Sequence, residues 1–131
     1  MGDNGERGRA TEPEDLSRFF LERANAGDVE GVVALYEPDA ALAGPSGTVT
    51  TGIQAIRQRY EQLLAGKRTF KGVTQAALRA GDLALTSTQF SASVVDPNGQ
   101  AMTVPAATAE VARRQPNGTW LWLIDQPNVL A

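Results

Sequence analysis

The chain has 131 residues, of which 12 are basic and 15 acidic, so its formal net charge is −3. It contains no cysteine and no histidine. These two absences exclude disulfides, thiolate nucleophiles, zinc fingers, Ser-His-Asp triads and imidazole acid–base chemistry. The length predicts one domain. The excess of acidic over basic residues does not indicate a nucleic-acid-binding surface. Proton transfer would therefore fall to carboxylates, tyrosines or lysines, and we expect neither a cofactor nor a metal.

The start of the chain and its hydropathy predict a cytoplasmic protein without a membrane partner. No stretch approaches the ~18–20 apolar residues that span a bilayer. The opening segment MGDNGERGR lacks the apolar centre of a secretory signal. Residues 1–13 are polar and glycine-rich and are expected to form a disordered tail. Residues 14–131 are expected to form the single domain.

Three helices are predicted in the first half of the chain. The first covers about residues 13–26, where apolar residues recur at helical spacing, a proline stands at the start and a glycine follows the end. The second is short and covers residues 28–37, with Asp28 as its N-cap and Tyr36 on its apolar face. The third covers residues 52–66, between two glycines.

The remaining segments have the pattern of strands. Short strands are predicted at residues 40–43 and 48–50. Longer strands are predicted at residues 70–79, 83–95, 102–114 and 119–126. Two Asn-Gly pairs between the later strands indicate hairpins. Helices followed by an antiparallel meander predict an α+β fold with the helices on one face of the sheet.

Serine and glutamine alternate along residues 87–93, and their face is ambiguous. They line a pocket if the strand has one register, and they form an exposed face if the register shifts by one residue. The loop before Gln100 determines which register holds.

Several motifs together resemble one family. The segment NAGDVEGVVALY at residues 25–36 resembles the helix pair of the ketosteroid isomerase-like, or SnoaL-like, branch of the NTF2-like superfamily. TGIQAIR at residues 51–57, followed by Tyr60, resembles that family's third helix, and GTWLWLIDQP at residues 118–127 resembles its last strand. The resemblance covers residues 14–128. It implies a cone in which a curved antiparallel sheet wraps around three helices and an apolar pocket, and it implies homodimers through the outer sheet face.

The chemical groups of the family's isomerases transfer only in part. The oxyanion-donating tyrosine of the first helix falls on Phe20, and the general-base aspartate falls on Gly44. The protonated aspartate of the penultimate strand falls on Glu110. A supporting tyrosine falls on Tyr60, and Tyr36 stands where some members carry a pocket tyrosine. The loss of two of the three main groups argues against steroid isomerase activity.

The last hairpin predicts a pair of facing acids. If Asn117-Gly118 forms a two-residue turn, Glu110 lies directly opposite Asp125, with Cβ atoms ~4.5–5.5 Å apart. Two carboxyls this close in a partly dry pocket should not both ionise, so one should have a raised pKa and hold the shared proton.

The family alignment also predicts which side of the last strand faces the pocket. It puts Leu123 and Asp125 inside, and it puts Trp120 and Trp122 outside. Arg113 would then stack on Trp122. Two exposed tryptophans would favour a dimer interface on this face.

These observations predict a small dimeric enzyme. It would bind a small apolar molecule, such as a polyketide or steroid-like compound, and catalyse cofactor-independent isomerisation, aldol-type cyclisation or dehydration. Glu110 and Asp125 would be the acid–base pair. Ligand contacts are assigned to Tyr36, Tyr60, Phe20, Leu123 and Thr108. The alternatives are a binding protein that has lost the chemistry, an accessory dimerisation domain, and two acids that are simply solvated at a sheet edge.

Overall fold

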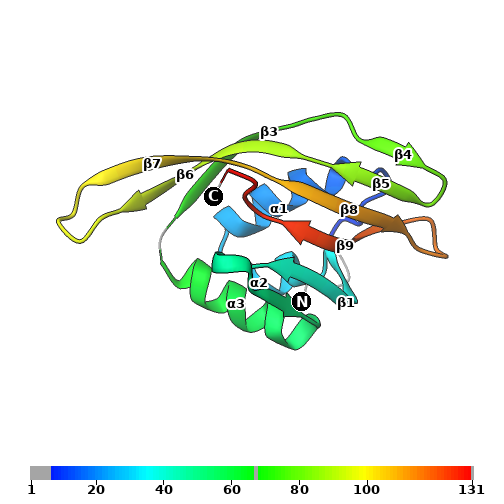
Figure 1. Ribbon diagram of the computed structural model, residues 1–131, viewed down its shortest axis with the longest axis horizontal. Coiled ribbons are helices and arrows are strands. Elements are labelled where there is room, and N and C mark those ends of the chain that lie inside the picture. The colour runs from blue at the N-terminus through cyan, green and yellow to red at the C-terminus, as the bar shows by residue number, and fades with distance from the viewer. Residues whose placement is uncertain (1–6, 67, 131) are drawn as a thin grey trace.

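The structure is a computed structural model that describes residues 7–66 and 68–130. Over these residues the helices are α1 (Asp15–Asn25), α2 (Val29–Val33) and α3 (Ile53–Ala65), with a 3-10 turn at Pro45–Gly47. The strands are β1 (Tyr36–Ala43), β2 (Val49–Thr51), β3 (Thr69–Thr74), β4 (Leu78–Ala80), β5 (Leu83–Thr86), β6 (Thr88–Val95), β7 (Ala101–Ala107), β8 (Ala109–Arg114) and β9 (Trp120–Gln126). Figure 1 shows the sheet curving over the helices, with the β6–β7 hairpin extending beyond them. None of the helices in the described segments is long and apolar enough to cross a membrane.

The curvature comes from a bend shared by two long strands. The strands form a six-stranded sheet in the order β2-β1-β9-β8-β5-β4 and a three-stranded sheet in the order β3-β6-β7. Only Ser87 separates β5 from β6, and only Thr108 separates β7 from β8. At the bend, the Thr108 N–H donates to the Thr88 carbonyl at 2.9 Å, and the Thr88 N–H donates to Thr108 Oγ1 at 2.9 Å. The predicted α+β fold with a curved sheet is confirmed, although the β1–β9 pairing is parallel rather than antiparallel.

The second helix is shorter than predicted. Asp28 caps it as expected, because its side chain accepts a hydrogen bond from the Gly31 N–H at 3.0 Å. Tyr36, however, starts β1 instead of continuing the helix. The reason is tertiary pairing: Tyr36 pairs with Trp122 of β9, whose N–H donates to the Leu35 carbonyl at 2.8 Å. This pairing overrides the local helical spacing.

An N-terminal strap, residues 7–14, packs against the domain. Ala10 is 3% exposed and Pro13 is fully buried. The Trp120 N–H donates to the Ala10 carbonyl at 2.8 Å. The expected disordered tail is therefore wrong for residues 7–13, because burial of these two apolar residues offsets their ordering entropy. Residues 1–6 lie outside the described residues.

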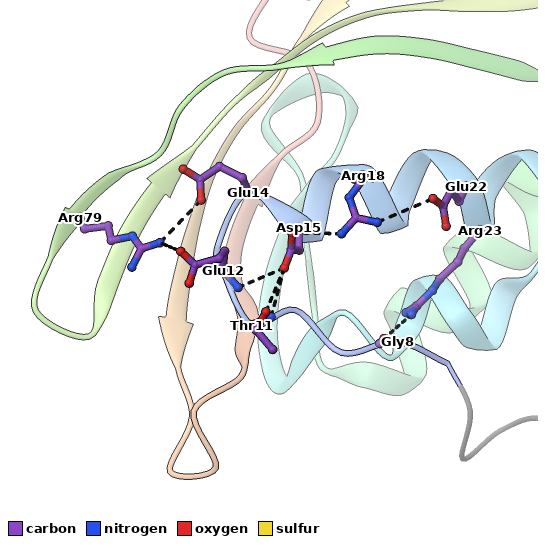
Figure 2. Close-up of polar contacts among 9 residues, drawn as sticks. All are labelled: Gly8, Thr11, Glu12, Glu14, Asp15, Arg18, Glu22, Arg23 and Arg79. Carbon is purple, nitrogen blue, oxygen red and sulfur yellow. Dashed lines mark hydrogen bonds and ion pairs between the residues drawn. The ribbon is translucent and has the colours of Figure 1, made fainter.

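Ion pairs and backbone hydrogen bonds hold this strap in place (Figure 2). The Asp15 carboxylate accepts from the Glu12 N–H at 3.1 Å. The Glu12 carboxylate in turn accepts from Arg79 Nη2 at 2.6 Å. Nη2 of Arg23, in α1, donates to the Gly8 carbonyl at 2.6 Å. The strap is thereby joined both to α1 and to the β4 edge of the sheet.

The last hairpin has a three-residue turn rather than the predicted two-residue turn. The Gln115 N–H donates to the Thr119 carbonyl at 2.7 Å, so Pro116-Asn117-Gly118 forms the turn. Gly118 has a φ of 86°, which glycine adopts without strain. Pro116 cannot close a two-residue turn because it lacks the N–H of a closing pair, and its ring suits the first central position of a type I turn.

A β-bulge at Leu123 compensates for the longer turn. Ala112 pairs with Trp122, whereas Val111 pairs with Ile124, so Leu123 is the extra residue. Beyond the bulge the predicted register returns, and the direct pairing of Glu110 with Asp125 is confirmed.

The bulge also changes which side chains face inward. Trp120 and Trp122 are each 2% exposed and belong to the core, so the prediction of outward tryptophans is wrong. Arg113 does not stack on Trp122. It donates two hydrogen bonds to the Glu37 carboxylate, at 2.8 and 2.6 Å.

The outside of the six-stranded sheet carries an apolar row instead. Leu78 pairs with Leu85, Leu85 with Val111, and Val111 with Ile124. Leu78 is 70%, Leu85 48% and Ile124 50% exposed. We call these four residues the outer row.

Candidate functional site

The facing acids are buried. Glu110 on β8 is 3% exposed and Asp125 on β9 is 4% exposed. They are direct partners across two strands, so their side chains share the inner face of the sheet. The alternative of two acids solvated at a sheet edge does not fit this burial.

A chain of two tyrosines ends on Asp125. The Tyr36 hydroxyl, at the start of β1, donates to Asp125 Oδ2. The Tyr36 and Tyr60 hydroxyl oxygens are 2.6 Å apart. Since Tyr36 has one hydroxyl proton and gives it to the carboxylate, Tyr60 of α3 must donate to Tyr36. Burial and the charge of Asp125 raise the pKa of both hydroxyls well above the ordinary tyrosine value, so both stay protonated.

A second, separate chain ends on Glu110. The Thr86 hydroxyl donates to Glu110 Oε1 at 2.7 Å. Trp122 Nε1 donates to the Thr86 hydroxyl at 3.3 Å. This chain exists because the bulge turns Trp122 inward.

The two carboxyls differ in their hold on a proton. Burial and the charge of Asp125 raise the pKa of Glu110 to about 8, although threonine hydroxyls act in the opposite direction. Burial raises the pKa of Asp125 to about 6, while the hydrogen bond from Tyr36 and the charge of Arg59 lower it. At neutral pH, Glu110 therefore keeps its proton and Asp125 is ionised.

A small cavity of about 40 Å³ lies between α1 and the bend in the sheet, next to this pair. Its buried end includes Glu110, Asp125 and Thr88, and its half-buried end includes Leu21 and Phe90. A site for one water needs ~10–15 Å³, so the cavity holds only a few water-sized groups. It is far smaller than the ~300–1,000 Å³ of typical ligand pockets.

The predicted ligand contacts fall in different places. Phe20, Tyr60 and Thr108 line the cavity. The ring of Phe20 packs edge-on against that of Tyr60, with centroids 6.0 Å apart. Tyr36 reaches the site through Asp125 instead. Leu123, the extra residue of the bulge, is half-buried and is not among the residues that line the cavity.

The sequence analysis missed Ser17 and Thr88. Both are buried, at 3% and 4% exposure, and both line the cavity. Ser17 lies three residues before Phe20 in α1, so helical spacing alone puts it on an inward face. Thr88 lies on the opposite strand face from Gln89, which is exposed. The serine and glutamine face of residues 87–93 is therefore not the face that lines the cavity.

The two lost family positions are filled by groups without acid–base chemistry. Phe20 offers no donor. At Gly44, a Cβ would lie 2.5 Å from Thr48 Oγ1 and 3.2 Å from Arg59 Nη1, so a side chain would require these neighbours to move. Within residues 7–66 and 68–130, no group of three acidic side chains is arranged to hold a metal ion.

A larger depression of about 550 Å³ lies between the strap and the last hairpin. Arg23 and Gln115 contribute to it, and its described lining residues include no carboxyl. It is more than ten times larger than the cavity beside Glu110 and Asp125. The two acids whose pKa values are raised, Glu110 and Asp125, both line the smaller cavity, and such groups in a cleft mark a functional site more strongly than size does.

Comparisons with known proteins give a consistent result. The sequence profile of the SnoaL-like domain family matches residues 17–120. No curated protein matches the chain in sequence. Among solved structures, the chain is similar to a ketosteroid isomerase-like protein from Erwinia carotovora atroseptica, with 19% identity and a TM-score of 0.70 over 86% of this chain and 89% of that one.

Two further structures support the same fold. An NTF2-like superfamily protein from Salmonella enterica serovar Typhimurium has 19% identity and a TM-score of 0.74, with 90% of each chain covered. An NTF2-like protein with a cystatin-like fold from Novosphingobium aromaticivorans has 20% identity and a TM-score of 0.74, covering 89% of this chain and 79% of that one. The resemblance found in the sequence and the NTF2-like fold are thus confirmed.

Proposed function

Because the chain belongs to the SnoaL-like domain family, we propose that it is a cofactor-independent acid–base enzyme acting on a small molecule. It moves a proton at a carbon next to a carbonyl, as isomerisation, aldol-type cyclisation and dehydration require. One observation carries this proposal: Glu110 and Asp125 face each other across two strands, both are buried, and each receives its own hydrogen-bond chain.

The roles follow from the protonation states. Asp125, ionised at neutral pH, is the general base that removes the substrate proton. Glu110, protonated at neutral pH, is the general acid that donates to the carbonyl oxygen. Tyr36 is a positioning residue, because it fixes one oxygen of Asp125 and leaves the other for the substrate. Asp125 thereby replaces the base that is lost at Gly44, and Glu110, which stands where the family's protonated aspartate falls, supplies the donor that is lost at Phe20.

Proton exchange provides a test that needs no known substrate. Small enolisable ketones, with hydroxyacetone among them, are incubated with the protein in D₂O, and loss of the α-proton signal is followed by ¹H NMR. We expect Glu110→Gln and Asp125→Asn each to lower the exchange rate by about 10²-fold or more. Glu61→Gln, an exposed acid on α3, is the matched control and should leave the rate unchanged. Full activity in both site variants would contradict the proposal.

A non-catalytic module of the same fold is the second candidate. The loss of donor and base at Phe20 and Gly44 favours it, and so does the small cavity. In this case the protein would bind a ketone and release it without deuterium, and neither site variant would change the background exchange rate.

We also expect a homodimer through the outer sheet face, and the cytoplasmic location remains a prediction from the sequence.

A further inference from the structure

Three buried side-chain oxygens lack a hydrogen-bond partner among the described residues. They are Ser17 Oγ, Thr88 Oγ1 and Asp125 Oδ1. Buried polar atoms in folded proteins almost always have a partner, because an unpaired one keeps the full penalty of desolvation. Each of these oxygens therefore requires an explanation.

All three oxygens belong to residues that line the one cavity next to the acid pair. They come from three different elements, α1, β6 and β9. Three separate elements therefore each direct an unpaired oxygen toward the same small space. The cavity volume of about 40 Å³ suits a polar group of about three heavy atoms, since one water needs ~10–15 Å³.

The hydrogen-bonding capacity of the site defines what fits. Ionised Asp125 can only accept, so its free oxygen requires a donor such as a hydroxyl. Protonated Glu110 can donate to a carbonyl oxygen. The hydroxyls of Ser17 and Thr88 can do either. A ligand end with a hydroxyl beside a carbonyl satisfies all of these groups together.

The other end of the cavity has a different character. Leu21, Phe90 and Pro127 line it, and all three are half-buried. The buried end thus suits a polar head, and the half-buried end suits an apolar body.

We propose that Ser17 and Thr88 are ligand-binding residues, which form with Asp125 a polar floor for the hydroxy-carbonyl head of the substrate. This rests on the proposed function, because it uses Glu110 and Asp125 in the same protonation states. It replaces the steroid or polyketide ring system expected from the sequence with a small polar head that carries an apolar substituent.

A matched pair of probes tests the proposal. Hydroxyacetone and butanone have the same shape and differ only in a hydroxyl in place of a methyl group. Their affinities for the full-length protein are measured at neutral pH by titration monitored with ¹H–¹⁵N NMR. We expect hydroxyacetone to bind at least 10-fold more tightly and to shift the amide signals of Thr88 and Asp125.

Two variants assign the selectivity to the floor. Thr88→Val and Ser17→Ala remove the unpaired hydroxyls without enlarging the side chain. Each should lower the hydroxyacetone affinity about 3- to 10-fold and leave the butanone affinity unchanged. The melting temperature should stay the same or rise, because a buried unpaired group is lost. Thr103→Val, at an exposed position of β7, is the control and should change neither affinity nor melting temperature.

Equal affinity for the two probes would overturn the proposal. So would a Thr88→Val protein that melts earlier and keeps full selectivity, since the hydroxyl would then be structural. Failure of the proposed function looks different: hydroxyacetone would bind selectively, but its α-protons would not exchange with D₂O.

Discussion

Glu110 and Asp125 are both carboxylic acids, both buried and directly opposite each other, yet they have different affinities for a proton. The difference comes from their neighbours. Asp125 accepts a hydrogen bond from Tyr36, which stays protonated. Asp125 also feels the positive charge of Arg59, and both effects favour the charged form of Asp125. Burial and the negative charge of Asp125 favour the neutral form of Glu110, and they outweigh the threonine donors, which favour its charged form. Environments that separate two pKa values are the mark of an acid–base pair.

The raised pKa of Glu110 predicts how stability depends on pH. Its pKa is about 8 in the folded protein against an ordinary value of 4.5. The folded state therefore binds this proton more tightly, and the resulting stabilisation is complete below pH 4.5 and lost as the pH rises towards 8. The pKa of Asp125 is raised from 3.8 to about 6, so its titration changes the stability at lower pH. Between about pH 6 and pH 8 the free energy of unfolding should thus fall, chiefly through Glu110.

Glu110→Gln should remove most of that fall, because glutamine does not titrate. Urea unfolding curves of wild-type and variant protein at several pH values measure it. Glu61→Gln, which removes an exposed acid, should keep the wild-type slope. A Glu110→Gln protein that loses stability as steeply as the wild type in this range would show that Glu110 is not the group that titrates there.

At the scale of helices and strands, the sequence analysis found most elements and one decisive pairing. The Glu110–Asp125 pairing was correct, although it depended on a two-residue turn that does not exist. The turn at Pro116-Asn117-Gly118 is one residue longer, and the bulge at Leu123 moves the register back by one. The two shifts cancel at Asp125 but not at Trp122, so the acids were placed correctly and the tryptophans were not.

Both hairpin turns have the same tripeptide, Pro-Asn-Gly, and the same geometry. In the β6–β7 hairpin the Asp96 N–H donates to the Gln100 carbonyl at 2.8 Å, and Gly99 has a φ of 82°. The proline before Asn-Gly was the available signal for a three-residue turn. Applied to this hairpin, the same rule would have turned Thr88 inward and Gln89 outward.

The bulge and the bend were harder to foresee. A bulge depends on how side chains pack from both sides of a strand, and no local residue preference in β9 marks Leu123 as the extra residue. The breaks at Ser87 and Thr108 have no proline or glycine. They are made by hydrogen bonds between distant segments, which a single sequence does not reveal.

One side chain of α1, Asn25, hydrogen-bonds both backbone groups of Phe70 in β3. Asn25 Nδ2 donates to the Phe70 carbonyl at 2.8 Å, and the Phe70 N–H donates to Asn25 Oδ1 at 2.7 Å. We expect Asn25→Ala to lower the free energy of unfolding by about 1–3 kcal/mol, because both backbone groups lose their partner. Chemical denaturation measures this loss. Gln62→Ala, at an exposed position of α3, should change stability by less than about 0.5 kcal/mol. Equal effects of the two variants would mean that the Asn25 contacts add nothing.

At the scale of the whole molecule, the bend gives the sheet a concave face that holds the site and a convex face that carries the outer row. The outer row crosses four neighbouring strands, β4, β5, β8 and β9, and stays exposed in the single chain. A contiguous exposed apolar surface of this kind marks an interaction site. We predict that its partner is a second copy of the chain.

The predicted homodimer can be tested with one charge. Leu85 lies in the middle of the outer row and is 48% exposed. Leu85→Glu should therefore keep the fold and produce a monomer at micromolar concentration. Light scattering coupled to size-exclusion chromatography measures the mass. Val95→Glu, at the exposed end of β6 and outside the outer row, should remain dimeric. A wild-type monomer, or a dimeric Leu85→Glu protein, would contradict this interface.

The central claim is that one of two facing carboxyls holds a proton at neutral pH while the other is charged. Side-chain ¹³C NMR reads the protonation of each carboxyl carbon directly, with signals assigned from Glu110→Gln and Asp125→Asn proteins. The pair should titrate in two separate steps, one near pH 6 dominated by Asp125 and one near pH 8 dominated by Glu110. If both carbons are fully ionised by about pH 6.5, as free side chains would be, the site has no proton to give and the proposed acid–base chemistry is wrong.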